Sequence, residues 1–432
     1  MSDTTEDQLA DSPYALPLKT VAAIQYALDV EDADLLREVM EPLHPADIAD
    51  HLEQINPYDR GRLIRLFGQD FEGEILSELD DGLREEVIDV LHPEVLAEAV
   101  RDLDSDDVVD LVEDLDEPQQ EAILDALEDA DRAVVEQSLA WPEESAGRLM
   151  QREFVFAPEH WTVGEAIDYL RSSDHLPEQF YHVVLVDPRM HPLANVTLGR
   201  LMGSHRDVPL RDITEEIFQV IPATQDEGDV AYAFNQYHLI SAPVVDDEGR
   251  MVGVITIDDA MAVLDQELEE DILRLAGVDN DSSLSDTAFE TSRRRVPWLL
   301  VNMVAAILAA LVIGLFEATI SAYVALAALM PIVASMGGNA GTQSLTVAVR
   351  ALATKDLTSS NVWRVIRREA VVGLTNGILF AVLIGGLSFL LFGDAKLGGG
   401  VAVAFVANIV TAAFCRTGGS IVLGRPGGGA AR

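Results

Sequence analysis

Four long stretches without a charged residue, all in the last third of the chain, constrain the fold more than any other feature. They cover residues 297–316, 318–349, 370–393 and 397–415. A helix rises about 1.5 Å per residue, so about 20 apolar residues cross a hydrocarbon core of about 30 Å, and helices of soluble proteins rarely run so long without charge. The pattern predicts an α-helical transmembrane domain over residues 296–415, with four helices in a lipid bilayer.

Charge divides the chain into two unlike halves. The whole chain has 29 Lys and Arg and 74 Asp and Glu. Residues from 293 onward carry 12 of the basic and 4 of the acidic residues, so residues 1–290 carry 17 basic and 70 acidic residues. Phosphate binding needs basic stripes, so this acidity argues against nucleic acid as a partner. Two interpretations of the acidic half stay open: divalent-cation binding at carboxylates placed by a motif, or a solvated surface suited to a high-salt cytoplasm.

Basic residues predict the orientation in the membrane. Arg293–Arg295 precede the first apolar stretch, and five more basic residues fill the loop after the second: Arg350, Lys355, Arg364, Arg367 and Arg368. The positive-inside rule places both groups in the cytoplasm. Residues 1–20 are acidic and lack an apolar run, so they predict a disordered tail rather than a signal peptide. We therefore expect a multi-pass protein of the cytoplasmic membrane whose N-terminal half lies in the cytoplasm.

Residues 21–142 show helical spacing, with apolar groups three and four residues apart. His44-Pro45 recurs as His92-Pro93, and each pair precedes an amphipathic stretch. Proline is well tolerated at the first position of a helix. The pattern predicts an acidic all-α domain of stacked helical hairpins, in which His44 and His92 cap or pack helices rather than bind metal.

Residues 143–268 predict strands alternating with helices, in two similar copies. The first contains the apolar run 181–187, and the second contains the runs 241–249 and 251–259 around an Asp/Gly turn. The two copies resemble a tandem CBS pair, an α/β regulatory module that dimerises and binds adenosyl ligands or cations. The second copy fits better, because Asn195-Val196-Thr197 in the first replaces the usual glycine-containing strand.

A glycine-rich motif inside the second apolar stretch carries the chemistry of the membrane domain. Pro331 removes a backbone donor, and Gly337, Gly338 and Gly341 weaken the helix, so we expect a break there. Broken backbone in a membrane must line protein or a water-filled cavity. Freed carbonyls with the amides of Asn339 and Gln343 suit a hydrated Mg²⁺ ion. The alternative is helix packing through the Gly337–Gly341 pair, which leaves the two amides unexplained.

The order of these parts resembles the MgtE family of magnesium transporters over nearly the whole chain. The acidic helical domain, the CBS pair, a connecting plug-like helix over residues 269–295 and the motif 337–341 followed by 349–354 all carry the resemblance. It implies a homodimeric channel, not an enzyme, that conducts Mg²⁺ and closes when Mg²⁺ binds between its acidic cytoplasmic faces. It further implies ATP as a second ligand of the CBS pair.

The resemblance also implies particular site residues. The pore residues are Gly337, Gly338, Asn339, Ala340, Gly341, Gln343 and Glu317. The metal ligands are Glu74, Asp106, Asp110, Asp246, Glu248, Asp258, Asp259 and Asp279. Thr256 with Asp259 is implied for a nucleotide ribose.

The chain departs from the family pattern at its end. The family's fifth helix is missing, and residues 416–432 form a Gly/Arg-rich tail, which we interpret as a frameshift near codon 415. One alternative function is therefore a membrane-anchored CBS sensor that does not conduct. Another is transport of Co²⁺ or Ni²⁺, although these softer ions prefer His or Cys ligands, and the motif has neither. Cys415 is the only cysteine, so an intrachain disulfide is excluded.

Overall fold

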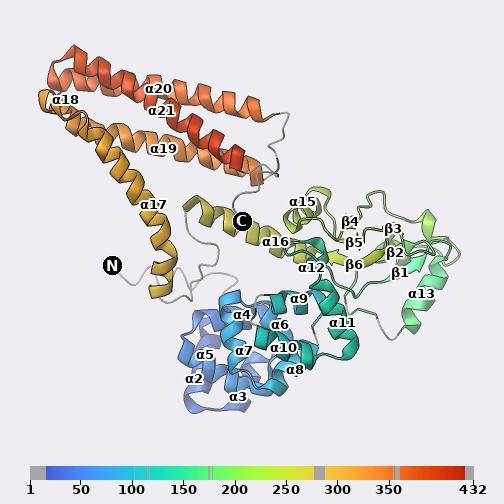
Figure 1. Cartoon of the computed structure of the whole chain (residues 1–432). Helices are drawn as coiled ribbons and strands as arrows, with labels where there is room; N and C mark the ends of the chain where they lie inside the picture. Colours follow the sequence, from blue (N-terminus) through green and yellow to red (C-terminus); the bar gives the residue numbers. More distant parts are fainter. Residues whose placement is uncertain are drawn as a thin grey trace. The chain divides into compact units, whose positions relative to one another are not determined.

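The structure is a computed structural model that describes residues 16–101, 103–113, 115, 117–173, 176, 177, 179–276, 288–353, 355 and 361–423 (Figure 1). It contains two compact units. One, up to residue 267, holds a helical domain and an α/β domain; the other, residues 268–276 with 288–423, holds the long apolar helices. The predicted multidomain architecture is confirmed.

Short helices follow one another through the N-terminal domain. They are α2 (Leu18–Val30), α3 (Ala33–Met40), α4 (Pro45–Gln54), α5 (Pro57–Phe67), α6 (Gly73–Ser77), α7 (Asp81–Val90), α8 (Pro93–Arg101), α9 (Ser105–Glu113), α10 (Glu117–Ala126) and α11 (Asp129–Ser138). Helix starts are evenly spaced at positions 33, 45 and 57 and again at 81, 93, 105, 117 and 129, while α6 is delayed by a 3-10 turn at Gly68–Asp70. The structural repeat is thus a pair of successive helices. The interval between the two His-Pro pairs of the sequence covers two such repeats.

Arginine ion pairs follow the same helix-pair repeat. The buried Arg60 pairs with Glu86 at 2.5 Å and donates from Nε to the carbonyl oxygen of Leu52 at 2.9 Å. The buried Arg84 pairs with Asp110 at 2.9 Å and donates to the carbonyl oxygen of Ser77 at 3.3 Å. Each guanidinium therefore satisfies the end of one helix and pairs with an acid 26 residues further on.

The two helices of this domain that follow His-Pro pairs are capped as the sequence predicts. His44 Nδ1 accepts a hydrogen bond from the Ala46 backbone N–H at 3.3 Å, and His92 Nδ1 accepts one from Glu94 at 3.4 Å. These bonds confirm the capping role of both histidines. The helical domain begins earlier than expected, because Leu18 already starts α2 inside the segment predicted as a disordered tail.

The α/β domain contains two three-stranded sheets of the same topology. The first is β1 (Phe156–Pro158), β2 (His182–Val186) and β3 (Pro192–Thr197), and the second is β4 (Ile221–Pro222), β5 (Ser241–Val245) and β6 (Met251–Thr256). In each sheet the first strand is parallel and the third antiparallel to the central one. His182 pairs with Thr197 and Ser241 with Thr256, so equivalent positions of the two copies are 59 residues apart.

Helices flank both sheets. They are α12 (Ala146–Leu149), α13 (Val163–Ser172), α14 (Leu198–Gly203), the 3-10 turn Leu210–Asp212, α15 (Glu227–Tyr237) and α16 (Ile257–Ala276). The boundary expected at residue 268 falls inside α16, which runs on without interruption. The described parts of the expected connecting helix over 269–295 are the end of α16 and the start of the next helix.

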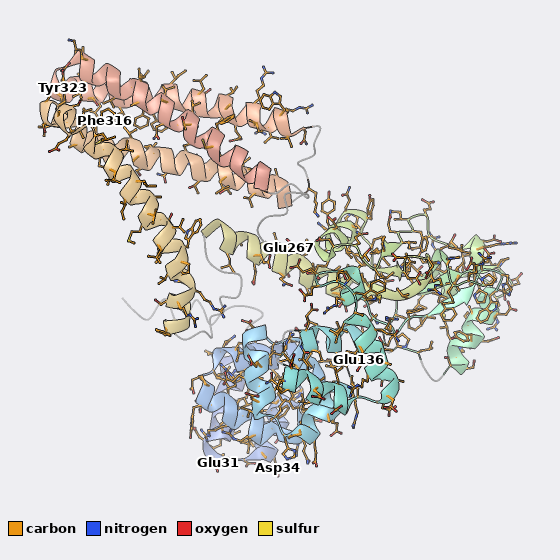
Figure 2. The ribbon with its side chains drawn as sticks, in the orientation of Figure 1. Glu31, Asp34, Glu136, Glu267, Phe316 and Tyr323 are labelled. Carbon is orange, nitrogen blue, oxygen red and sulfur yellow. The ribbon has the colours of Figure 1, made fainter. Side chains whose placement is uncertain are left out.

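The second unit consists of α17 (Ala288–Gly314), α18 (Glu317–Ala322), α19 (Ala325–Ala353), α20 (Val362–Phe392) and α21 (Ala395–Leu423). Three of these helices contain segments long and apolar enough to cross a membrane: 291–314, 362–392 and 395–415. Phe316 and Tyr323 flank the short α18 (Figure 2). Of the tail expected from residue 416, the part up to Leu423 continues α21.

Small residues let α20 and α21 approach closely. Buried positions of α20 recur every three or four residues: Glu369, Gly373, Gly377, Ala381, Gly385 and Ser388. A Cβ on Gly398 of α21 would lie only 2.8 Å from the carbonyl oxygen of Gly385. Close backbone approach through small residues is the usual way to pack helices where no hydrophobic effect acts between them.

Candidate functional site

Two helices begin with paired carboxylates where the helical domain meets the second CBS copy. α9 carries Asp106 and Asp107 in its first turn, and α16 carries Asp258 and Asp259 in its first turn. Asp259 is near enough for its charge to act on both Asp106 and Asp107. We call these four residues the acidic junction. The helix N-termini, which carry partial positive charge, offset part of this repulsion.

Three carboxyl groups of the acidic junction, those of Asp106, Asp107 and Asp259, have raised pKa values. Burial, and next the charge of Asp259, raises the pKa of Asp106 well above its usual range and that of Asp107 to about 7. Burial raises the pKa of Asp259 to about 6, although hydrogen bonds from Thr256 oppose the shift. Carboxylates that resist joint ionisation are stabilised by a proton or by a cation between them.

Hydrogen bonds position both helix starts. Thr256 donates its hydroxyl to Asp259 Oδ2 at 2.6 Å, and its backbone N–H donates to the same oxygen at 3.3 Å. At the other helix, Ser105 donates its hydroxyl to Glu153 Oε2 at 2.8 Å and accepts from the Arg152 backbone N–H at 2.8 Å. Glu153 thus ties α9 to the segment that leads into β1. Sequence reasoning missed Glu153, because nothing near it in the chain indicates a partner 48 residues away.

The glycine motif forms part of a continuous helix, so the predicted break is wrong. α19 runs through Pro331 and through 337–341 without interruption. A proline costs one backbone bond, whereas a broken helix in an apolar medium leaves several groups unsatisfied at several kcal/mol each. The backbone carbonyls of the motif are therefore engaged within the helix, and the freed-carbonyl model of the pore is not supported.

The two sides of α19 differ in burial and polarity. Gly337 and Gly341 are buried, and a Cβ on Gly337 would lie 2.1 Å from the side-chain nitrogen of Asn408 in α21. The packing interpretation of these two glycines is supported. The other side of α19 is exposed and polar within an apolar helix: Ser335, Asn339, Thr342, Gln343 and Thr346. This polar face is the part of the motif that suits a hydrated ion.

Comparison with known proteins relates each part of the chain to one family. Models for the MgtE intracellular N domain, the CBS domain and a divalent cation transporter match residues 43–144, 206–266 and 330–426. The magnesium transporter MgtE of Thermus thermophilus is 31% identical over 419 residues, covering 91% of this chain and 90% of that protein. This chain belongs to the MgtE family of magnesium transporters. MgtE of Bacillus subtilis is 27% identical over 374 residues, 87% of this chain and 83% of that one.

Solved structures support the same assignment for the soluble part. The cytosolic domain of the Mg²⁺ channel MgtE in complex with ATP superposes with a TM-score of 0.52 at 29% identity, over 56% of this chain and 99% of that one. The soluble part of a magnesium transporter has the same fold, with a TM-score of 0.51 at 24% identity over 58% and 98% of the two chains. The identification as a family of transporters, rather than enzymes, agrees with the sequence analysis.

The remaining described metal ligands implied by the MgtE resemblance differ in how close they lie to the acidic junction. Asp110, one turn along α9, is near enough for its charge to help raise the pKa of Asp107. Asp110 pairs with Arg84, and Glu74 is exposed on α6. Asp246 accepts hydrogen bonds from the backbone and the guanidinium of Arg250, at 2.9 and 2.8 Å, and Glu248 pairs with the same arginine. Burial would raise the pKa of Asp246, but these bonds lower it. Asp279 lies outside the described residues.

No three carboxylate or imidazole groups in the described part of this MgtE chain converge closely enough to hold an ion by direct bonds alone. Mg²⁺ retains several of its water molecules and is commonly held by one or two carboxylates. The acidic junction therefore fits water-mediated binding, and no closed cage of protein ligands is needed.

A second acidic group lies at the opposite end of α9, and sequence reasoning missed it. Burial, followed by the charges of Glu144 and Glu113, raises the pKa of Glu227 at the start of α15 to about 7. Glu113 pairs with Arg148 at 3.1 Å, and Glu267 of α16 adds a further charge (Figure 2). The Asp226-Glu227 pair at a helix start was the available signal. Both ends of α9 thus face carboxylates of the CBS pair.

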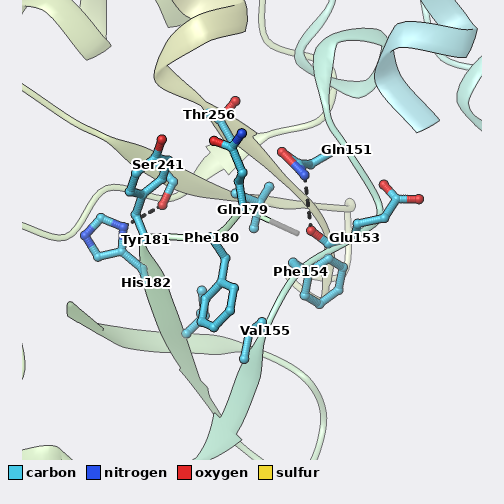
Figure 3. Close-up of a pocket in the computed structure, with 12 residues that line it drawn as sticks. Gln151, Glu153, Phe154, Val155, Gln179, Phe180, Tyr181, His182, Ser241 and Thr256 are labelled. Carbon is cyan, nitrogen blue, oxygen red and sulfur yellow. Dashed lines mark hydrogen bonds between the residues drawn. The ribbon is translucent and has the colours of Figure 1, made fainter. Parts of the chain in front are cut away.

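A narrow cleft separates the two CBS copies (Figure 3). His182 and Ser241, which are equivalent positions of the two copies, are joined by a hydrogen bond of 2.6 Å between Nδ1 and Oγ. Tyr181, Phe180 and Thr256 also line the cleft. The cavity measures about 20 Å³, which is room for about one water molecule. A nucleotide would therefore require the cleft to open.

Proposed function

We propose that this chain conducts Mg²⁺ across the cytoplasmic membrane and that cytoplasmic Mg²⁺ bound at the acidic junction regulates conduction. One observation carries the regulatory part: Asp106 and Asp259 are of like charge, partly buried and set across a contact between two domains. Such a contact is stable only when its charge is compensated. The polar face of α19 supports the conducting part, because hydroxyl and amide oxygens can replace lipid beside a hydrated ion.

The regulation follows from differential binding. Repulsion across the acidic junction disfavours the packed arrangement of the helical domain and the CBS pair at low Mg²⁺. A divalent ion between the carboxylates binds the packed arrangement better than the open one and therefore increases its population. High cytoplasmic Mg²⁺ thus selects the packed, closed state, and Mg²⁺ depletion releases it. Asp246 and Glu248 remain predicted Mg²⁺ ligands. A Mg²⁺ ion that binds both carboxylates must displace the guanidinium of Arg250, which pairs with them.

Limited proteolysis of the full chain in detergent tests the acidic junction. In the unchanged chain we expect Mg²⁺ to slow cleavage between the helical domain and the CBS pair. The double variant Asp106→Asn/Asp259→Asn should need at least tenfold more Mg²⁺ for the same protection. The control Asp168→Asn/Asp212→Asn changes two carboxylates elsewhere on the CBS pair. Equal Mg²⁺ dependence in all three proteins would remove the junction from the sensor.

Flux measurements test conduction separately. In vesicles that contain the purified chain and a Mg²⁺-sensitive dye, we expect Mg²⁺ entry that Asn339→Leu and Gln343→Leu both reduce. Ser359→Ala is a control outside the apolar stretches. An inactive chain with an intact Mg²⁺ response in proteolysis would favour the alternative, a membrane-anchored sensor. Faster entry of Co²⁺ or Ni²⁺ than of Mg²⁺ would favour transport of a different divalent ion.

The cleft between the CBS copies supports ATP as a second ligand. The MgtE cytosolic domain to which this chain is similar was solved in complex with ATP. Thr256, which lines the cleft, offers a hydroxyl, and Asp259 beside it offers a carboxylate for a ribose. Thr197 is the equivalent residue of the first copy and caps α14. ATP binding in EDTA should weaken in Thr256→Ala and persist in Thr197→Ala, and equal loss in both would contradict the assignment.

Exposed methionines support a homodimer formed through the CBS pair. Met202 of α14 and Met261 of α16 are 66% and 55% exposed and occupy equivalent positions of the two copies. We propose that a second copy of the chain covers them. Met202→Glu/Met261→Glu should lower the dimeric fraction measured by light scattering in detergent, whereas Glu159→Gln on the same domain should not.

A further inference from the structure

Three arginines and a tryptophan form one exposed surface at the start of α20. Trp363 is 72% exposed, and Arg364, Arg367 and Arg368 are exposed as well. The three arginines stand at i, i+3 and i+4, so they share one side of the helix. No carboxylate among the described residues forms an ion pair with any of them.

The helical phase shows what this surface faces. The buried side of α20 runs through Glu369, Gly373 and Gly377 and packs on α21. Arg367 precedes Glu369 by two positions, about 200° around the helix, so it points away from α21. Following the helix from Arg367 at the same phase gives a continuous exposed apolar row: Val371, Leu374, Ile378 and Val382. The arginine surface therefore continues directly into an exposed apolar row within a segment long and apolar enough to cross a membrane.

The position along the helix matches the headgroup layer. The uncharged stretch begins at residue 370, so Arg368 and Arg367 stand about 3 and 4.5 Å before it at about 1.5 Å per residue, and Arg364 stands about 9 Å before it, at the outer edge of the layer. The interfacial layer on each side of the hydrocarbon core is about 5–8 Å thick, and tryptophan is enriched there. A guanidinium donates two parallel hydrogen bonds to a phosphate, which a choline or amine headgroup cannot replace.

We propose that Trp363, Arg364, Arg367 and Arg368 form a binding site for the headgroup of an anionic phospholipid. The arginines hold the phosphate and the net negative charge, and the acyl chains lie along the apolar row from Val371. Trp363, one position further from the hydrocarbon core than Arg364, lies at the outer edge of the headgroup layer. The positive-inside rule assigns this end of α20 to the cytoplasmic leaflet. The site concerns lipid alone and requires neither ion conduction nor Mg²⁺ sensing.

The acidic soluble half of the chain is the competing partner for these arginines. The observations favour lipid, because the arginine surface shares its helical phase with the exposed apolar row and not with a surface that packs on protein. The experiment distinguishes the two partners.

The test measures lipid selectivity of the full chain. The purified protein, in nanodiscs of equal phosphatidylglycerol and phosphatidylcholine, is extracted and its retained lipids are quantified by native mass spectrometry. We expect enrichment of phosphatidylglycerol that falls with rising salt and falls roughly fivefold for each arginine replaced, since each basic residue near the surface contributes about that factor. Arg364→Gln/Arg367→Gln/Arg368→Gln should show no enrichment, and the corresponding lysine variant should retain part of it.

The control Arg171→Gln/Arg189→Gln/Arg211→Gln removes the same charge from the exposed surface of the CBS pair. It should enrich phosphatidylglycerol as the unchanged chain does. If the triple variant at α20 does not fold, the single variants Arg364→Gln and Arg367→Gln carry the same test. Undiminished enrichment in the arginine variants would overturn the proposal. If the arginine variants keep their phosphatidylglycerol enrichment but change the Mg²⁺ dependence of proteolysis in neutral lipid, the proposal is also overturned. That result would show that the arginines bind the acidic soluble half of the chain.

Discussion

Asn408 of α21 donates its side-chain amide to the carbonyl oxygen of Val333 in α19 at a distance of 2.6 Å. The bond crosses Gly337, whose missing side chain leaves the space that the amide occupies. One glycine of the predicted pore motif thus makes room for a hydrogen bond between two helices. The adjoining Asn339 is on the exposed side of the same helix.

Gly337→Ala should therefore disrupt the α19–α21 contact. A methyl group there would lie 2.1 Å from Asn408 Nδ2, and overpacking of this kind costs about 1–3 kcal/mol. We expect a lower Tm of the detergent-solubilised chain and slower Mg²⁺ entry into vesicles. The matched control is Gly338→Ala, since a Cβ on Gly338 has no neighbour within 4 Å.

The second-site variant Asn408→Ala should partly rescue Gly337→Ala, because it removes the atoms with which the methyl group collides. The double variant is expected to have a higher Tm than Gly337→Ala alone. Additive losses in the double variant would show that the two residues do not share one contact.

Asp106 and Asp110, one turn apart in α9, should respond oppositely to neutralisation. Asp106→Asn removes a partly buried charge that faces Asp259, so it should raise the Tm of the cytosolic transition in EDTA. Asp110→Asn takes the charged partner from the buried Arg84, and because Asp110 is itself mostly exposed we expect a loss of about 1–2 kcal/mol. Calorimetry with and without Mg²⁺ checks both signs. A stabilised Asp110→Asn would contradict the ion-pair role.

His44→Ala should destabilise the helical domain by about 1 kcal/mol, since the imidazole caps α4. His44→Asn, which retains an acceptor, should recover most of this loss. The exposed His205 on the CBS pair provides the control substitution His205→Ala. Thermal unfolding followed by the protease sensitivity of residues 18–138 gives the measurement. Equal stability of His44→Ala and the unchanged chain would remove the capping interpretation.

Glu227 predicts a pH dependence of stability. Its pKa is raised from 4.5 to about 7 on folding, so the folded chain holds this proton more tightly than the unfolded chain. The associated stability is present in full below about pH 4.5 and is lost as the pH rises towards 7. Unfolding temperatures in EDTA should fall over this window, and the fall should be smaller in Glu227→Gln. The exposed Glu159→Gln should not change the slope. The same slope in Glu227→Gln and the unchanged chain would contradict the assignment.

The sequence by itself determined the membrane domain, the two CBS copies, the acidic helical repeat and the capping role of His44 and His92. These features depend on local composition, periodicity and short-range hydrogen bonds, which can be predicted from one segment of the chain. The family followed from the order of these parts. In the sequence the helix-pair repeat shows only as the interval between the two His-Pro pairs, which is twice its length. The repeat between them is hidden because α6 begins later than the regular spacing of helix starts requires.

Only the tertiary structure decided which carboxylates meet. Asp106 and Asp259 lie in different domains, far apart along the chain, and burial and mutual charge, which depend on three-dimensional distance, make them a pair. The same structure brings Arg84 to Asp110, an acid that the sequence could not distinguish from the junction pair. It also kept α19 continuous, because in an apolar medium the backbone bonds of a helix outweigh the weak helical preference of proline and glycine.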